Sequence, residues 1–501
     1  MSGLGFRVSE APPHLRPDTR HLAPDTRGTR RIAINTAAPM AARLIDAAFA
    51  VVYLRLLGRT DVAEYQFLVV FTTYLDTLVD FGLNALLARE VPRNPAVASA
   101  ALRRVSLLRL GLWLIGLPLI AVVYGPGQDA ANLTTEAAAA GVLFYAALLP
   151  TVLAKTASGL LWGLERLDLT AAVSVLATVL KVGVGALVLF GGFGLIGLAA
   201  TSALVNLLTA AALLLLLARR MPTEKAAPAA QPWLRESWPL FLNQLLQGLF
   251  FKIDALLLPA LGGLSAAGAY AAAYKVSEGA GILSSSFTLA LFPRLAASET
   301  PSAAYRMALR ILLQVAFPLA AGVALLAQPI IAVIGGRDYL PDAAVALAIL
   351  ICYLPLSYAN GLTQYVLIAA GRQRALTVAF VAALVFNLVA NVLLIPRFGY
   401  IGAAWVTVLS ELVLLVPFQV LASRIAPDVS PLVEARLPLL ATLLMAPVVW
   451  WLRDAAHPLL AMLAGVLIYP AALWSLGGIN AQQRLLFESL MPAGYARRLR
   501  L

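Results

Sequence analysis

Long apolar stretches, separated by short polar connections, run through almost the whole chain and restrict it to a membrane. Of its 501 residues, 61% are hydrophobic and only 12% are charged, whereas a soluble domain holds about 25% charged residues. A helix of about 20 mostly apolar residues crosses a bilayer. The sequence therefore predicts an all-α, polytopic membrane protein of about 14 transmembrane helices, which we place at 32–57, 62–87, 104–124, 137–157, 169–190, 195–217, 238–261, 265–292, 307–334, 341–369, 375–395, 400–423, 436–452 and 457–476.

The basic residues are concentrated in every second loop between the predicted spans. Most arginines and lysines between the spans fall on the side that also holds both ends of the chain, and cytoplasmic loops carry this excess. We therefore expect a multi-pass protein of the plasma (inner) membrane with both termini in the cytoplasm. The net charge of +12 then reflects topology, and no nucleic-acid partner is expected. With one cysteine, Cys352, and three histidines, we expect no disulfide and no metal site.

Three local patterns recur about 205 residues apart and indicate a duplication. They are the turn at Leu57–Gly58 and Leu261–Gly262, the prolines Pro150 and Pro355, and FGLIG at 193–197 with FGYIG at 398–402. Six spans per repeat preserve orientation, so the repeat is parallel, about an axis along the membrane normal. We predict a disordered cytoplasmic tail (1–30), an N-terminal six-helix lobe (31–217), a cytoplasmic linker (218–237), a C-terminal six-helix lobe (238–424), two extra transmembrane helices (425–480) and a cytoplasmic basic tail (481–501).

Charged side chains interrupt several spans, where each costs about 2.5–3.5 kcal/mol unless it faces protein, ligand or water. Arg43 and Asp46 lie three residues apart and could pair on one helix, whereas Lys155, near the end of its span, could snorkel to the headgroups. We predict a basic cavity between the lobes near mid-membrane, with carboxylates as counter-charges or as a site that couples transport to an ion. The cations are Arg43, Lys181, Lys252 and Lys275, and the acids are Asp46, Asp254 and Glu278.

Uncharged polar side chains also recur at helical spacing within the spans. They need a partner other than lipid, and either hydrogen bonds between helices or a polar cavity would supply one. The candidates for a cavity are Asn243, Gln247, Tyr270, Tyr274, Asn360, Gln364 and Asn387.

Several of these segments, taken in order, resemble one family of membrane proteins. The matching stretches are DFGLNALLAREVPR at 80–93, PLFLNQ at 239–244, KIDALLL at 252–258, AYKVSE at 273–278, GGRDY at 335–339, AGRQR at 370–374 and NLVANVLLIPRFGYIGAA from Asn387. The chain resembles the polysaccharide biosynthesis flippases (O-antigen or exopolysaccharide translocases) of the multidrug/oligosaccharidyl-lipid/polysaccharide exporter superfamily over about residues 30–480.

The resemblance implies two lobes and alternating access, and a function in cell-surface polysaccharide synthesis. The expected substrate is an undecaprenyl-pyrophosphate-linked oligosaccharide, moved from the cytoplasmic to the outer leaflet. Its pyrophosphate would meet the basic cavity, since Lys and Arg suit phosphate, and the Asn, Gln and Tyr side chains would contact the glycan. Expected partners are membrane lipid, the polyprenyl-pyrophosphate-linked glycan, a polysaccharide polymerase and a chain-length protein. No cofactor is expected beyond H⁺ or Na⁺ as a coupling ion.

Two other functions compete with this interpretation. A cation-coupled multidrug antiporter of the same superfamily would need an acidic cavity, which Asp46, Asp254, Glu278 and Glu411 could form. A membrane glycosyltransferase or polymerase would need paired acids or bases near a substrate site, often on a long outer loop. No such loop is present in the sequence, so we expect a protein that is not an enzyme and has no catalytic residues.

Overall fold

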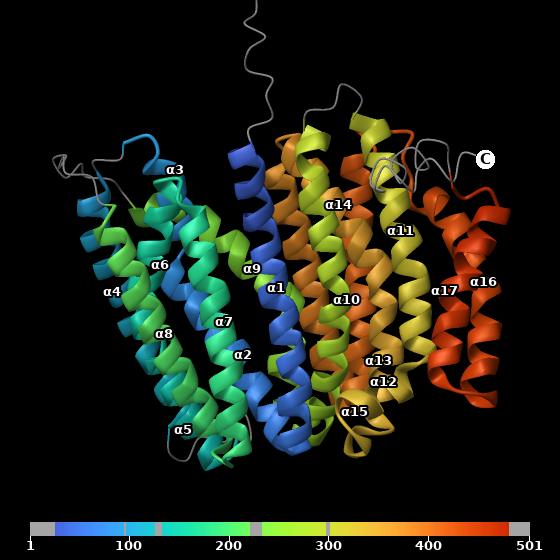
Figure 1. Cartoon of the computed structure of the whole chain (residues 1–501), viewed down its shortest axis with the longest axis horizontal. Helices are drawn as coiled ribbons and strands as arrows, with labels where there is room; N and C mark the ends of the chain where they lie inside the picture. The colour runs from blue at the N-terminus through green and yellow to red at the C-terminus, as the bar shows by residue number, and fades with distance from the viewer. Residues whose placement is uncertain (1–25, 95–96, 126–132, 221–232, 297–300, 480–501) are drawn as a thin grey trace, which may run out of the picture.

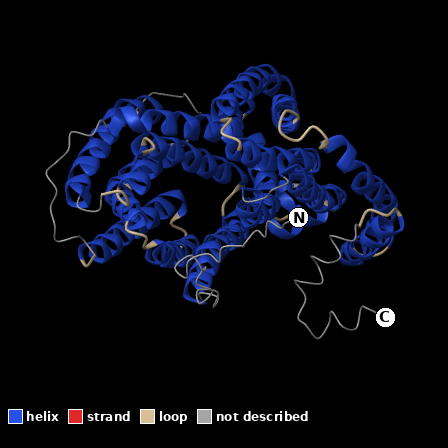
Figure 2. Ribbon diagram, turned by 90° about the horizontal axis from the view of Figure 1, so that it is seen from above, coloured by secondary structure: helices blue, strands red, loops and turns tan. Residues whose placement is uncertain are grey.

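The computed structural model describes residues 26–94, 97–125, 133–220, 233–296 and 301–479, and within these ranges the regular elements are all helices (Figures 1 and 2). Most of the predicted tails and the middle of the predicted linker lie outside them. The first half comprises α1 (Thr26–Leu56), α2 (Arg59–Asp80), α3 (Leu83–Glu90), α4 (Ala98–Tyr124), α5 (Thr135–Ala146), α6 (Leu148–Gly163), α7 (Leu167–Phe190) and α8 (Gly194–Ala218). The second half comprises α9 (Trp233–Gly262), α10 (Leu264–Ala296), α11 (Pro301–Leu325), α12 (Ala327–Ile334), α13 (Asp342–Leu350), α14 (Leu354–Ala369), α15 (Gln373–Ala422), α16 (Pro431–Ala455) and α17 (Pro458–Ser475).

Many of these helices are long enough to cross a bilayer. In the described residues, ten helices have the length and composition of a membrane span, or eleven if the bent pair α2 and α3 counts as one span. The 50 residues of α15 would measure about 75 Å at 1.5 Å per residue, far more than the roughly 30 Å hydrocarbon core. Gly399 breaks this helix, with φ 55° and ψ −134°. The chain is a multi-pass membrane protein, and the number fourteen stays a prediction.

The helices form two packed groups with a pair added at one edge (Figure 1). In the first group, which we call the N-lobe (α1–α8), α1 packs along α7, α7 along α8, and α8 along α5 and α6. In the second, the C-lobe (α9–α15), α9 packs along α15, and α14 lies between α15 and α11. The α16–α17 pair attaches to the C-lobe through α11. Apolar packing therefore continues inside each group, while the lobes meet chiefly where α2 lies against α9 and α10.

The two lobes share local backbone features at the positions of the predicted repeat. Gly194 and Gly399 occupy the same place in FGLIG and FGYIG, and their φ angles are 51° and 55°, a region that only glycine adopts readily. The helices α6 and α14 both begin shortly before the repeated prolines, Pro150 and Pro355, each after a break in the preceding helix. These features agree with a duplication, and the superposition of whole lobes stays a prediction.

Backbones of the two lobes approach closely at Gly82. This residue, at φ 71°, ends the bend between α2 and α3, and a Cβ placed on it would lie 2.9 Å from the carbonyl oxygen of Ser237 in α9. Beside it the ring of Phe81 stacks on Phe241, with centroids 4.4 Å apart. The DFG segment of the sequence thus forms part of the contact between lobes.

Candidate functional site

A group of three charged side chains lies on α9 and α10, and we call it the Lys252–Lys275–Glu278 triad. The Nζ atom of Lys252 is 2.8 Å from Oε1 of Glu278, and Nζ of Lys275 is 2.9 Å from Oε2. Both lysines lie about 15 Å from the end of the bundle where α9 turns into α10, close to half the thickness of the hydrocarbon core. One carboxylate therefore serves two cations, and the triad keeps a net positive charge at mid-membrane depth.

The triad is partly open rather than sealed. The side chains of Lys252, Glu278 and Lys275 are 36%, 31% and 18% exposed. The three charged groups are therefore not fully covered by neighbouring side chains, and a cavity around them stays a prediction. A sealed ion group would instead be fully covered by neighbouring side chains.

The N-lobe also contributes to the surroundings of the triad. Asp46 of α1 lies near enough to Lys275 to interact with it electrostatically. Tyr53 of α1 likewise interacts electrostatically with Glu278. The hydroxyl of Tyr53 is buried and has no hydrogen-bond partner in the described part of the chain. A buried donor of this kind is costly unless water or a ligand satisfies it, so the site offers an unused hydrogen bond beside its charges.

Asp254 lies apart from the triad, inside the C-lobe. Its carboxylate is 3% exposed and accepts hydrogen bonds from the hydroxyl of Tyr270, from Thr407 Oγ1 at 3.2 Å and from the amide of Ala255 at 2.8 Å. Lys252, which interacts with Asp254 electrostatically, pairs with Glu278 instead. Asp254 is thus a carboxylate held by neutral donors within the C-lobe.

An unsatisfied oxygen lies on the helix that packs against Asp254. On α15, Nδ2 of Asn391 donates to Oδ1 of Asn387 at 2.8 Å, and the buried Oδ1 of Asn391 has no partner within the described residues. Asp254 of α9 and Thr407 of α15 meet between these helices, and Asn387 and Asn391 are buried on the same α15. Carboxylate, hydroxyl and amide oxygens are the ligands that a hard cation prefers. No cluster of three or more His, Cys, Asp or Glu that could hold a metal ion is found among the described residues.

The other predicted cations do not join the triad. Arg43 is exposed on α1, and Lys181 lines a separate hollow between α6, α7 and α8. Asp46 is exposed and Glu278 is half-buried. The structure thus brings Lys252, Lys275 and Glu278 together and places Lys181 in the N-lobe.

Some of the residues predicted to contact the glycan are buried, and others are half-buried. Asn360 is buried and donates to Oε2 of Glu411 at 2.7 Å, while Asn387 and Tyr270 are buried in the C-lobe as described above. Asn243 accepts from Thr377 at 2.8 Å, and Tyr274 donates to the carbonyl oxygen of Phe251 at 2.6 Å. Gln247 and Gln364 are half-buried, and contact with a glycan stays a prediction for all seven.

Sequence reasoning missed an ion network inside the N-lobe. Arg109 of α4 is 0% exposed and donates to Asp80 at 2.9 Å, to Asn84 at 3.0 Å and to Thr156 at 2.8 Å. Lys155 does not extend to the headgroups, because its Nζ lies 2.7 Å from Asp76 on α2. The spacing of Asp76 and Asp80 could have predicted this network, because it places two acids on one face of a helix.

Contacts between the lobes close the end of the bundle where α1 turns into α2. The guanidinium of Arg59 pairs with Asp342 at 2.5 Å and donates to the carbonyl oxygen of Ser265 at 2.7 Å. Tyr400 also donates to Asp342, at 3.0 Å, and Arg55 donates to the carbonyl oxygen of Val333. We call these contacts the Arg59 clasp, and they link α1 and α2 of the N-lobe to α10, α12 and α13 of the C-lobe.

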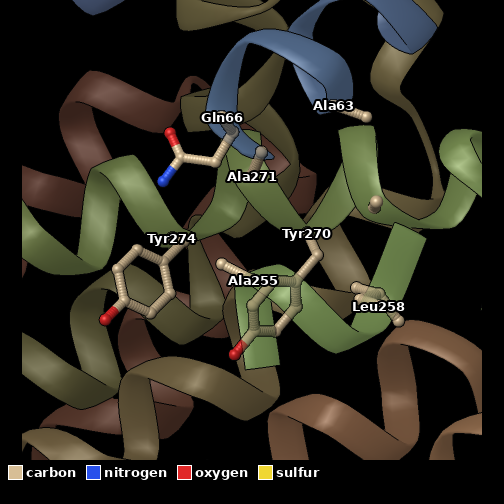
Figure 3. A pocket seen from close by; sticks show the side chains of 8 residues that line it. Ala63, Gln66, Ala255, Leu258, Tyr270, Ala271 and Tyr274 are labelled. Carbon is tan, nitrogen blue, oxygen red and sulfur yellow. The ribbon is translucent and has the colours of Figure 1, made fainter. Parts of the chain in front are cut away.

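The space directly below this clasp is nearly filled. Gln66 of α2 lies opposite Tyr270 and Tyr274 of α10 around a hollow of about 10 Å³ (Figure 3), which is room for roughly one water molecule. Gln66, Tyr270 and Tyr274 thus pack closely around this point between the clasp and the triad.

An apolar hollow of about 440 Å³ lies between α11, α16 and α17. Leu319, Leu326, Met445, Val449 and Val466 line it, with Gln314 and Tyr469 at its polar end. The α16–α17 pair thus forms an apolar surface depression beside the C-lobe.

The family model described as "Polysaccharide biosynthesis protein" matches residues 29–299 of the chain. The chain belongs to this family. The matched region ends just after α10, so it contains every residue of the Lys252–Lys275–Glu278 triad. No curated protein matches the chain in a sequence search.

Solved structures share the fold of this polysaccharide biosynthesis protein. The structure titled "Lipid II flippase MurJ, inward closed conformation" is 15% identical with a TM-score of 0.72, and the match covers 88% of this chain and 98% of that one. A multidrug resistance MATE family transporter of the MOP superfamily in an inward-facing conformation is 18% identical with a TM-score of 0.59, covering 78% and 98%. A MOP superfamily transporter from Pyrococcus furiosus Vc1 is 16% identical with a TM-score of 0.58, covering 79% and 95%.

Proposed function

We propose that this protein is a flippase that moves an undecaprenyl-pyrophosphate-linked oligosaccharide from the cytoplasmic to the outer leaflet for cell-surface polysaccharide synthesis. The observation that carries the proposal is the pair of lysines that share one carboxylate, half-exposed at mid-membrane depth. The family match and the fold shared with a lipid II flippase support it.

The triad suits a pyrophosphate in both charge and geometry. Lysine is a mobile point charge that binds phosphate well, and two ammonium groups already converge on a single anion. An incoming pyrophosphate would take the place of Glu278 as their partner. The lysines would thus never be left as unpaired cations inside the membrane, which keeps both the empty and the loaded state low in energy.

The Arg59 clasp supports alternating access. It closes one end of the bundle, and we assign that end to the outer side, with both termini in the cytoplasm. Substrate would reach the triad from the cytoplasmic side, and separation of Arg59 from Asp342 would then release it outward. The glycan would pass between the lobes, while the polyprenyl chain stays in lipid, for which the apolar hollow beside α16 and α17 offers a surface. A polysaccharide polymerase and a chain-length protein would use the product outside.

We further propose that a cation, H⁺ or Na⁺, drives this cycle. Two carboxylates can take it up. Asp46 is exposed near Lys275, and Asp254 is buried inside the C-lobe on α9, which packs along the helix that carries Asn391. Transport by each Asp→Asn variant, measured in proteoliposomes with an imposed Na⁺ or pH gradient, distinguishes the two carboxylates. Only replacement of the residue that takes up the coupling ion should make transport insensitive to the gradient. Gradient dependence retained in both Asp46→Asn and Asp254→Asn would remove this part of the proposal.

A multidrug antiporter fits the same fold less well. A cationic drug needs accessible acids, but Asp254 and Glu411 are 3% and 2% exposed and bonded to neighbours. At the lobe contact, Lys252 and Lys275 share Glu278, and Asp46 of α1 is an exposed acid near Lys275. Two ammonium groups that converge on one carboxylate suit an anionic substrate better than a cationic drug.

The decisive experiment is transport by the purified full-length protein in proteoliposomes. A short polyprenyl-pyrophosphate-linked disaccharide is placed in the inner leaflet, and its arrival outside is measured by oxidation with membrane-impermeant periodate. Lys252→Ala and Lys275→Ala should each abolish transport, and Lys→Arg at either position should retain more activity than Lys→Gln. Full transport by both Ala variants would contradict the proposal.

A further inference from the structure

A second polar hollow, of about 310 Å³, lies inside the N-lobe between α6, α7 and α8, and the function proposed above does not use it. We call it the N-lobe pocket. Pockets that hold small ligands measure about 300–1,000 Å³, so this volume suits a compact ligand. Two lysines, Lys155 and Lys181, line it, and its lining includes no carboxylate.

The charges around the pocket leave one cation uncompensated. Lys155 pairs with Asp76 at 2.7 Å, and Arg109 pairs with Asp80 at 2.9 Å, so these four charges cancel. Lys181 makes no hydrogen bond or ion pair within the part of the chain that the structure describes. A lone ammonium group inside a membrane span is costly, and a single negative charge in the pocket would compensate it.

The depth of Lys181 strengthens this conclusion. It lies about nine residues before the end of α7, which corresponds to roughly 14 Å. That is too far for ready snorkelling to the headgroups in a span of about 30 Å. The ammonium group therefore finds its partner inside the protein or in a bound ligand.

Three threonines of the pocket offer acceptor oxygens to a ligand that donates hydrogen bonds. Thr151, Thr178 and Thr209 each donate to the carbonyl oxygen four residues earlier, at 3.1, 2.9 and 2.7 Å. Each hydroxyl has thereby used its one proton and keeps its oxygen lone pairs as acceptors. Sugar hydroxyl groups donate to such oxygens, whereas a fully ionised phosphate has no proton to give.

We propose that the N-lobe pocket binds an acidic sugar unit, a monoanion with several free hydroxyl groups. Its carboxylate would pair with Nζ of Lys181, and its hydroxyls would donate to the threonine oxygens. That the unit belongs to the transported glycan rests on the proposed flippase function. The preference for an acidic sugar over a neutral one rests only on the charge and hydrogen bonding of the pocket.

Calorimetric titration of the purified full-length protein with sodium glucuronate, glucose and inorganic phosphate tests the ligand class. We expect glucuronate to bind at least about tenfold more tightly than either of the others. Equal affinity for glucose would show that Lys181 does not select for charge, and equal affinity for phosphate that falls in Lys181→Gln would reveal a simple anion site in the pocket. Either result would overturn the proposal.

Variants then locate the binding. Lys181→Gln should weaken glucuronate binding about tenfold, Lys181→Arg should preserve it, and Thr178→Val, which keeps the side-chain shape, should weaken it severalfold. Asp342→Asn, in the Arg59 clasp and away from both lysine sites, is the control and should bind glucuronate normally. Unchanged affinity in both Lys181→Gln and Thr178→Val would place the ligand elsewhere and refute the assignment.

The transport assay separates the two proposals. If glucuronate binding depends on Lys181 but proteoliposomes move no lipid-linked disaccharide, the pocket stands as a site for a free sugar acid and the flippase function fails. If transport is intact and Lys181→Gln binds glucuronate normally, the flippase function stands and the N-lobe pocket assignment fails.

Discussion

Two ion groups within the membrane-spanning part of this protein differ chiefly in exposure. In the N-lobe, Arg109 is fully buried and its donors meet Asp80, Asn84 and Thr156. At the lobe contact, Lys252 and Lys275 share Glu278 and stay partly exposed. The first group is closed to solvent around Arg109, whose Nε atom is buried without a partner among the described residues. The second has one carboxylate for two cations and stays partly exposed, so we assign structure to the first and function to the second.

Replacing Asp80 with Ala should produce the largest effect, on stability. It leaves the guanidinium of Arg109 buried without its counter-charge, and breaking a buried pair in this way costs about 3–5 kcal/mol. Thermal unfolding in detergent should show a much lower midpoint than the wild type. Lys252→Ala serves as the control and should unfold near the wild-type temperature. Similar unfolding midpoints for the two variants would contradict the assignment of a structural role to the Arg109 group and a functional role to the triad.

The complementary experiment removes a lysine from the triad. Lys275→Ala should reduce transport of the lipid-linked disaccharide by at least about tenfold, the equivalent of roughly 1.4 kcal/mol of lost transition-state binding. Its thermal midpoint should change little, because Lys252 remains to neutralise Glu278. A variant that unfolds early but transports normally when folded would assign the triad to structure instead.

Glu278→Gln removes the negative charge of the triad and keeps both of its lysines. Both lysines then lack their partner, so the free pyrophosphate-linked disaccharide should bind severalfold more tightly. Transport should nevertheless fall, because the carboxylate no longer helps displace the substrate on release. Binding measured by fluorescence competition and transport measured in proteoliposomes should move in opposite directions. Weaker binding would show that Glu278 contacts the substrate favourably.

The smallest expected effect concerns the Arg59 clasp. Its pair with Asp342 is partly exposed, and such pairs contribute about 0–1 kcal/mol. Asp342→Asn should therefore raise the population open at this end by at most about fivefold. Maleimide labelling of Gln66→Cys, in a Cys352→Ser background, measures that opening, since Gln66 lines the gap below the clasp. Labelling unchanged by Asp342→Asn would show that the clasp does not hold the lobes closed.

Much of the fold followed from apolar patterning, but the partners of the charges did not. The spans predicted at 169–190 and 195–217 agree closely with α7 and α8. The break at Gly399 falls at the boundary that was predicted between the spans 375–395 and 400–423. By contrast, Arg109 was not among the predicted site residues. Its burial depends on Asp80 and Thr156, which come from other helices and are remote in sequence.

The site shows the same division. Lys252, Lys275 and Glu278 were identified because charge inside an apolar span is costly, and this cost is a local property of each helix. That Glu278 serves both lysines, that Lys181 lies instead in the N-lobe pocket, and that Asp254 is held by Tyr270 and Thr407 depend on helix rotation and packing. Sequence by itself determined an all-helical membrane protein with charges that need partners. Only the tertiary structure decided which partner each charge has, because helices distant in the chain must pack before their side chains can meet.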